Sequence, residues 1–140
     1  MAVDNPLSPH GGQLIERIAA PADAAHMAAG LPRLPVRDSI AREVINLAYG
    51  FFSPLDGFMV RSEVESVVKN MTLTSGLVWS IPIIFDISRQ AMTDAGITQG
   101  SSVLLTYQDQ ALAVLEVTEA FSSVLESMAQ HAYGTTDREH

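Results

Sequence analysis

Cysteine is missing from this 140-residue sequence, and lysine occurs once, as Lys69. Without cysteine there can be no disulfide framework, no zinc site with thiolate ligands and no thiol catalysis. Eight basic residues, seven of them arginines scattered between Arg17 and Arg138, face sixteen acidic ones, which gives a net charge of −8. Because polyanions are bound largely through lysine and arginine, this composition argues against a nucleic-acid partner. It also argues against a high-affinity site for ATP or sulfate in this chain alone.

Long apolar runs are missing as well. No stretch approaches the roughly 18 uninterrupted apolar residues that a membrane-spanning helix needs, and residues 1–12 lack the basic and apolar regions of a signal peptide. We therefore expect no membrane partner and a cytoplasmic location. With 47% apolar and 17% charged residues, the sequence has the composition of one globular domain large enough to bury a core.

Motifs that hold phosphates or pairs of metal ligands are also absent. The sequence contains neither G-x-x-x-x-G-K-[ST] nor G-x-G-x-x-G. None of the histidines forms an H-x-x-x-H pair, so we expect exposed or locally hydrogen-bonded imidazoles. These histidines are His10, His26, His131 and His140.

Two arrangements of reactive side chains were considered and rejected. Ser53, His10 and Asp56 could form a nucleophilic triad, but Ser53 precedes a proline and lies outside any G-x-S-x-G elbow. Glu63 and Glu65 are two residues apart and so do not face each other on a helix. We therefore expect no catalytic residue, no substrate-binding residue, no metal ligand and no cofactor site in this chain.

Local patterns predict a mixed α+β chain whose first half is mainly helical. Helices are indicated by apolar residues at steps of three and four, by an early proline in an alanine-rich segment, and by capping boxes. The expected helices cover residues 21–29, 38–50, 62–71 and 123–132. The capping boxes are Ser62 with Glu65 and Ser123 with Glu126, and Asp38 and Ser39 are further cap candidates.

Extended segments are expected mainly in the second half. Apolar residues alternate from Trp79 to Ile87, which predicts a strand with one buried face, and Pro82 would place that strand at an edge or a bulge. Two apolar runs on either side of residues 108–110 predict a hairpin. Several short strands with helices indicate a small barrel or a strongly bent sheet. The expected strands cover residues 13–18, 34–36, 79–87, 102–107 and 111–118.

The segment from Gly50 to Met59 predicts a helix end followed by a loop. Gly50 suits the end of a helix, and Pro54 prevents its continuation. A proline without an amide donor and the carboxylate of Asp56 are poorly suited to a phosphate cradle. We therefore predict that residues 53–59 form a structural loop. Its expected apolar anchors are Phe51, Phe52, Leu55, Phe58 and Met59.

The same segment carries a family resemblance. Its string S-P-L-D-G-F-M, residues 53–59, resembles the S-P-L-x-G-F-M signature of the N-terminal domain of ATP sulfurylases, the sulfate adenylyltransferases. Further similar strings follow in the family's order from residue 9 to residue 140. They are P-H-G-G-Q-L at 9–14, M-T-L at 71–73 with Gly76, Trp79, I-P-I at 81–83 and Asp86, L-A-V-L-E-V at 112–117, and Y-G-T-T-D at 133–137 with His140. Ser80 and Gln110 depart from the family, which usually has proline and glycine there.

The resemblance implies a PUA-like fold for residues 1–140, a bent β-barrel or pseudo-barrel with flanking short helices. It also implies a parent reaction in which ATP and sulfate give adenosine 5′-phosphosulfate and pyrophosphate, with Mg-ATP as a substrate of the parent enzyme. The family's Q-x-R-N-P-x-H and G-R-D-H motifs occur nowhere in this sequence. The resemblance therefore implies that the catalytic domain is absent from this chain, and it transfers no catalytic residue to it.

Three classes of function remain open. The first, favoured by the resemblance, is the non-catalytic N-terminal domain of a sulfurylase. Its expected partner is the missing catalytic domain, within an intact enzyme that forms a homo-oligomer. The second is a free-standing PUA-like binding or interaction module without enzymatic activity. The third is an independent small enzyme, for which no constellation of residues was found.

Overall fold

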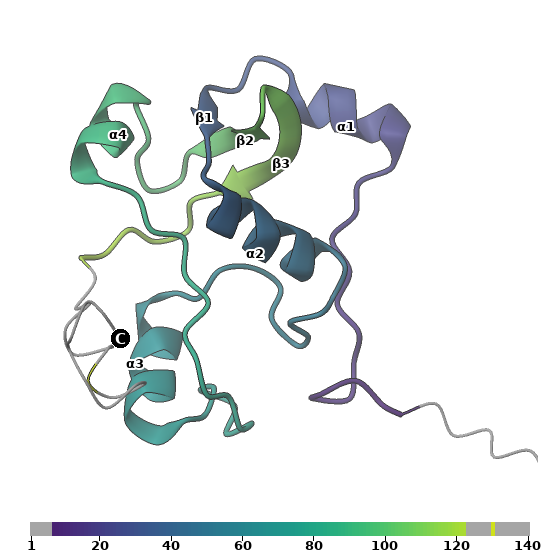
Figure 1. Cartoon of the computed structure of the whole chain (residues 1–140), viewed down its shortest axis with the longest axis vertical. Helices are drawn as coiled ribbons and strands as arrows, with labels where there is room; N and C mark the ends of the chain where they lie inside the picture. Colours follow the sequence, from purple (N-terminus) through teal and green to yellow (C-terminus); the bar gives the residue numbers. More distant parts are fainter. Residues whose placement is uncertain (1–6, 123–129, 131–140) are drawn as a thin grey trace, which may run out of the picture.

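The computed structural model describes residues 7–122 and residue 130, and these form an α+β arrangement of short elements (Figure 1). In chain order the elements are α1 (Pro21–Ala28), β1 (Arg33–Pro35), α2 (Asp38–Ala48), α3 (Arg61–Asn70), α4 (Arg89–Asp94), β2 (Ser102–Tyr107) and β3 (Gln110–Glu116). The α+β class and the first three expected helices are confirmed. α4 was not predicted. The helix expected over 123–132 lies, apart from residue 130, outside the described residues.

The described residues contain one three-stranded sheet in the order β1-β2-β3. β1 runs parallel to β2 and β3 runs antiparallel to it, with Leu34 opposite Leu105 and Val103 opposite Leu115. The predicted hairpin is confirmed, but its turn has two residues rather than three. Gln108 and Asp109 have φ values of 49° and 62°, as a type I′ turn requires. A turn of this type is favoured because its geometry matches the right-handed twist of the two strands.

The sequence of α2 provides both an apolar stripe for burial and a glycine that ends the helix. Its buried residues recur on one stripe, namely Ile40, Ala41, Val44 and Leu47. Gly50, with φ of 76°, follows the helix. The amide of Gly50 donates to the carbonyl of Leu47 at 3.2 Å, and the amide of Phe51 donates to that of Asn46 at 2.9 Å. These two bonds form a Schellman motif, which satisfies carbonyls at the helix end.

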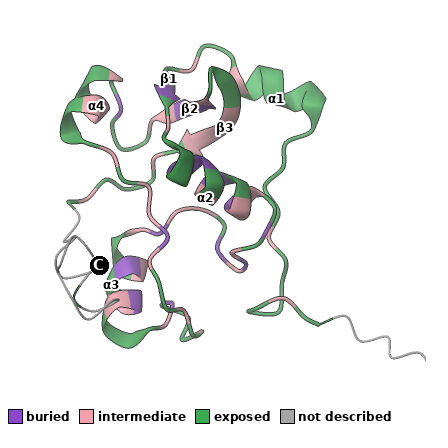
Figure 2. Ribbon diagram, viewed as in Figure 1, coloured by how far each residue is buried: buried purple, intermediate pink, exposed green. Residues whose placement is uncertain are grey.

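Two apolar clusters make up the core. The sheet cluster joins α2 to the strands and the segment after α4, and its buried members are Leu34, Ile40, Val44, Ile97, Val103 and Leu105. The loop cluster joins α3 to irregular segments, and its buried members are Leu47, Leu55, Met59, Val64, Val67, Leu73 and Ile83. Figure 2 shows the buried residues on β1, β2, α2 and α3, whereas α1 contains no buried residue.

Two expected strands are not strands. Residues 13–18 and residues 79–87 run without a helix or a ladder. The amide of Arg17 donates to the carbonyl of Ala48, and the amide of Met59 donates to the carbonyl of Ile83, each at 2.8 Å. A strand needs a neighbouring strand to complete its ladder, and these segments lie instead beside a helix end and a loop. The buried face expected from the alternation over residues 79–87 is confirmed only in part, since Ile83 is buried but Ile81 is exposed.

The predicted capping box at Ser62 and Glu65 is wrong, because α3 begins earlier. Its N-cap residue is Val60, which has no side-chain oxygen. The amide of Arg61 instead donates a hydrogen bond to the carboxylate of Glu119, at 3.1 Å. A carboxylate 58 residues away thus satisfies one of the orphan amides of this helix end. Neither Asp38 nor Ser39 is the N-cap of α2, as had been expected. The N-cap is Arg37, which makes no side-chain cap bond.

Candidate functional site

The loop of residues 53–59, which carries the most recognisable string of the sequence, is built into the fold. Ser53 is buried, and its hydroxyl donates to the carbonyl of Gly50 at 2.6 Å while accepting the amide of Ile15 at 2.9 Å. Leu55 and Met59 are buried in the loop cluster. Both hydrogen-bonding roles of the Ser53 hydroxyl are therefore used for structure, which supports the interpretation of a structural loop.

Two aromatic residues of this region behave differently. Phe58 is half-buried and packs against both apolar clusters, with its ring edge-on to Phe85 at a centroid distance of 5.5 Å. Phe51 is 74% exposed, so its expected role as an anchor was wrong. Its backbone closes α2 and leaves the ring in solvent.

The three residues of the rejected triad have different partners. The Nε2 atom of His10 lies 2.7 Å from the carbonyl of Val78, and the carboxylate of Asp56 pairs with Arg17 at 3.1 Å. Within the described part of the chain, no hydrogen bond joins Ser53 to His10 or His10 to Asp56. The arrangement therefore does not form a nucleophilic relay. His26 lies exposed on α1, and His131 and His140 lie outside the described residues.

The P-H-G-G turn joins two strings that are far apart in the sequence. Gly11 has φ of 79°, and an added Cβ would lie 3.0 Å from Pro54 and 3.1 Å from Leu77. The ring of His10 lies 6.0 Å from that of Trp79, which in turn meets Phe52 edge-on at 6.3 Å. The turn, the loop and the tryptophan segment thus form one packed unit. These strings encode contacts between segments, and this explains their composition without a bound ligand.

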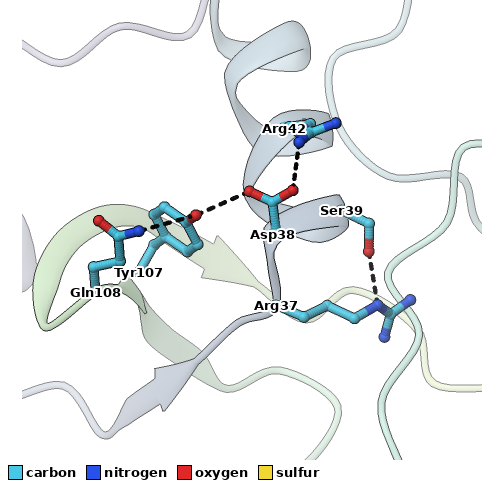
Figure 3. Close-up of polar contacts among 6 residues, drawn as sticks. All are labelled: Arg37, Asp38, Ser39, Arg42, Tyr107 and Gln108. Atoms are coloured by element: carbon cyan, nitrogen blue, oxygen red, sulfur yellow. Dashed lines mark hydrogen bonds and ion pairs between the residues drawn. The ribbon is translucent and has the colours of Figure 1, made fainter.

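A polar cluster lies where the β2–β3 hairpin meets the first turn of α2 (Figure 3). Asp38 accepts a hydrogen bond from the hydroxyl of Tyr107 at 2.9 Å and pairs with Arg42 at 2.6 Å, while Gln108 donates to the same hydroxyl at 3.2 Å. The hydrogen bond to Asp38 raises the pKa of Tyr107, because an ionised tyrosine could not donate it. The i,i+4 spacing of Asp38 and Arg42 was visible in the sequence. The contact with Tyr107, 69 residues from Asp38, was not.

Two clefts are open on the described surface, and neither has the character of a nucleotide site. The first, about 200 Å³, lies between α2 and residues 82–86 and contains Arg37, Glu43 and Asp86. Arg37 is already paired with Asp86 at 2.5 Å. Burial raises the pKa of Glu43. The second cleft, about 520 Å³, contains Glu116 and no basic residue. Anions such as ATP are stabilised by cationic groups, but the arginine of the first cleft is paired with a carboxylate and the second cleft contains no basic residue.

The cations of the described residues are largely neutralised within the chain. Arg17, Arg37, Arg42 and Arg61 each form an ion pair with a carboxylate, namely Asp56, Asp86, Asp38 and Glu119. Over residues 7–122 and 130, no group of three or more potential metal ligands is found. No helix of the described chain is long and apolar enough to cross a membrane. No step of a reaction is assigned to the described residues.

Comparison with known proteins gives a consistent result. A family model described as a PUA-like domain matches residues 7–140. The sulfate adenylyltransferase of Synechococcus sp. (strain JA-3-3Ab) is 36% identical over 138 residues, which cover 96% of this chain and 35% of that protein. The probable bifunctional SAT/APS kinase 2 of Sorangium cellulosum is 38% identical over 138 residues, covering 96% of this chain and 23% of that protein.

A solved structure agrees with these matches. The hexameric APS kinase from Thiobacillus denitrificans superposes with a TM-score of 0.72 at 28% sequence identity, covering 85% of this chain and 24% of that one. The matches to sulfate adenylyltransferases fall in the N-terminal portion of those proteins. The chain thus spans about a third of the length of the Synechococcus relative.

Proposed function

Because the chain belongs to the PUA-like domain family, we propose that it is the non-catalytic N-terminal domain of a sulfate adenylyltransferase. The observation that carries the proposal is the alignment of 96% of this chain with one portion, 35%, of the Synechococcus enzyme. The family resemblance from residue 9 to residue 140 is confirmed by these matches. The whole enzyme would join ATP and sulfate to give adenosine 5′-phosphosulfate and pyrophosphate, in the cytoplasm.

The division of labour follows from the charges. Sulfate attacking the α-phosphorus of ATP brings two anions together, so the site needs cations, usually including Mg²⁺ on the phosphates. In this chain four of the described arginines are paired with carboxylates. We therefore assign substrate binding and chemistry to a catalytic domain, and assign to this chain the role of a scaffold that contacts it within a homo-oligomeric enzyme.

Replacement of a domain tests the proposal. This chain is fused in place of the aligned N-terminal portion of the Synechococcus enzyme, and sulfate-dependent release of pyrophosphate is measured. We expect the chimera to be active and the isolated chain to show no turnover above a blank. Turnover by the isolated chain that survives repurification would show that it is an enzyme itself. A soluble but inactive chimera, beside an active parent, would contradict the scaffold role.

The alternative of a free-standing binding module is tested separately. RNA is the ligand weighed for such a module, and the net charge of −8 argues against it. We expect no saturable binding of labelled structured or single-stranded RNA below about micromolar concentration at roughly 0.15 M salt. Saturable binding in that range would favour the module over the scaffold.

A further inference from the structure

The segment Leu14 to Ile18 forms an arm that is fixed on one side and open on the other. The amide of Ile15 donates to the hydroxyl of Ser53 at 2.9 Å, and the amide of Arg17 donates to the carbonyl of Ala48 at 2.8 Å. The guanidinium of Arg17 also pairs with Asp56 at 3.1 Å. Every second amide of the arm is therefore bonded to the end of α2 or to the loop that follows it.

The amides between them are not bonded. Those of Leu14, Glu16 and Ile18 have no hydrogen-bond partner among residues 7–122 and 130. Successive amides of an extended chain alternate between its two edges. The arm thus resembles an edge strand with one edge seated on the fold and the other free, and such an edge is a ready template for an added strand.

Exposed apolar side chains lie on the arm and on the helix end to which the arm is bonded. Leu14 and Ile18 on the arm are 52% and 56% exposed, and Tyr49 and Phe51 at the end of α2 are 54% and 74% exposed. They are neighbours because the arm bonds to Ala48 and because Leu14 lies against Gly50. Contiguous exposed apolar side chains on a soluble domain mark an interaction surface. We call these four residues with Glu16 the arm face.

The arm face is held in place by a position that only glycine fits. Gly50 has φ of 76°, and a Cβ there would lie 2.7 Å from Leu14 and 2.8 Å from the carbonyl oxygen of Ile15. The arm lies directly against the backbone of the helix end. A free edge that is positioned in advance loses little conformational entropy when a partner binds.

We propose that the arm face docks the catalytic portion of the sulfurylase, which adds an extended segment to the free edge at Leu14, Glu16 and Ile18. The inference rests on the proposed function. The length of the relatives outside the match and the negative charge of this chain both favour that partner. About two thirds of the Synechococcus relative lies outside the match, and this remaining portion is large enough to cover the arm face. A second copy is a poorer fit, because symmetric pairing centred on Glu16 would oppose two carboxylates on a chain of net charge −8. The docking segment carries apolar residues on both sides of a basic one.

Amide hydrogen exchange on the active chimera tests the free edge. We expect the amides of Leu14, Glu16 and Ile18 to exchange at least about tenfold more slowly in the chimera than in the isolated chain. The amides of Ile15 and Arg17, already bonded in the chain itself, serve as the internal control. Equal exchange of the three outward amides in both proteins would overturn the proposal.

Two substitutions test the apolar part, with a matched control. Ile18→Glu and Phe51→Glu place a charge on the arm face, while Met27→Glu does so on α1, where Met27 is 50% exposed. In the isolated chain all three should melt close to the parent. In the chimera the first two should raise the rate of proteolysis between the domains at least about tenfold, and Met27→Glu should not. If all three behave alike in an active chimera, the docking surface lies elsewhere while the proposed function stands.

Sedimentation of the isolated chain tests whether a second copy of the chain, rather than the catalytic portion, covers the arm face. We expect a monomer. A dimer that Phe51→Glu dissociates, with the amide of Glu16 protected in it, would assign the arm face to a second copy and overturn the proposal. An inactive, undocked chimera would instead contradict the proposed function itself.

Discussion

The sheet cluster and the loop cluster bury similar side chains but are built in different ways. The sheet cluster lies on a ladder of three strands and on the stripe of α2. The loop cluster combines α3 and Leu47 of α2 with irregular segments, which are joined by isolated contacts such as Met59 to Ile83 and the bridge between Thr72 and Val78. Regular backbone pairing is therefore not required to bury an apolar core, provided that side chains from several segments meet.

The two clusters are not independent. Phe58 packs against both of them, and its partner Phe85 belongs to the sheet cluster. This shared packing raises the question of whether the two clusters unfold in one transition or in two. Substitutions in each cluster and between them can decide this.

The largest effect is expected in the sheet cluster. Leu105 lies in the central strand and is almost inaccessible to solvent. Leu105→Ala should lower the free energy of unfolding by about 3 to 4 kcal/mol, through lost burial and the cavity that remains. Urea denaturation followed by circular dichroism and by Trp79 fluorescence measures it, since Trp79 reports on the loop cluster. Coincident transitions would join the clusters, and separate ones would divide them.

The next effect concerns the link between the clusters. Phe58→Ala should cost about 2 to 3 kcal/mol, below the range of about 3 to 5 for a fully buried phenylalanine, because Phe58 is half-buried. The matched control is Phe51→Ala, since Phe51 is largely exposed. Equal melting temperatures for the two variants would contradict the bridging role of Phe58.

A smaller effect is expected at the end of α2, where the loop cluster begins. Gly50→Ala forces a side chain into the left-handed region and against the arm, and should cost about 2 kcal/mol. Gly57→Ala is the control, because a Cβ there meets nothing within 4 Å. Thermal melting compares them. A Gly50→Ala protein as stable as the control would mean that the arm is not held in the way described.

What the sequence predicts well is what neighbouring residues decide. The stripe of α2 and the β2–β3 hairpin depend on residues a few positions apart, and both were predicted, although the turn was expected to be one residue longer. The segment 13–18 was expected to form a short strand, but its partners are Ala48 and Ser53, which supply no ladder. The start of α3 depends on Glu119, which a local capping pattern cannot reveal.

In the candidate site, too, the sequence predicted what neighbouring residues decide and missed what distant contacts decide. The rejection of the triad rested on the proline after Ser53, and the structure gives its three members separate partners. The contact between Tyr107 and Asp38 spans 69 residues, and the free edge of the arm depends on which amides happen to be bonded. Neither leaves a periodic trace in the sequence.

The smallest effect concerns Glu43, in the cleft between Ile40 of the sheet cluster and Ile83 of the loop cluster. Burial raises its pKa above the usual 4.5, so the folded state binds the proton more tightly than the unfolded state. This carboxyl therefore costs stability increasingly as the pH rises from about 4.5 through the raised pKa. Glu43→Gln should be slightly more stable than the parent near pH 7, with the gain vanishing below about pH 4. Melting curves across that range measure it, and a gain independent of pH would contradict the cause.

The arm has a consequence for the order in which the chain folds. Its bond from Ile15 to Ser53 closes a loop of 38 residues, and its ion pair from Arg17 to Asp56 closes one of 39. The hairpin of β2 and β3 closes over a two-residue turn. Long loops cost more entropy to close and form their contacts later. Although the arm precedes α2 in the chain, we expect it to settle after α2 has formed, so that its outer edge is completed only once the helix end beneath it exists.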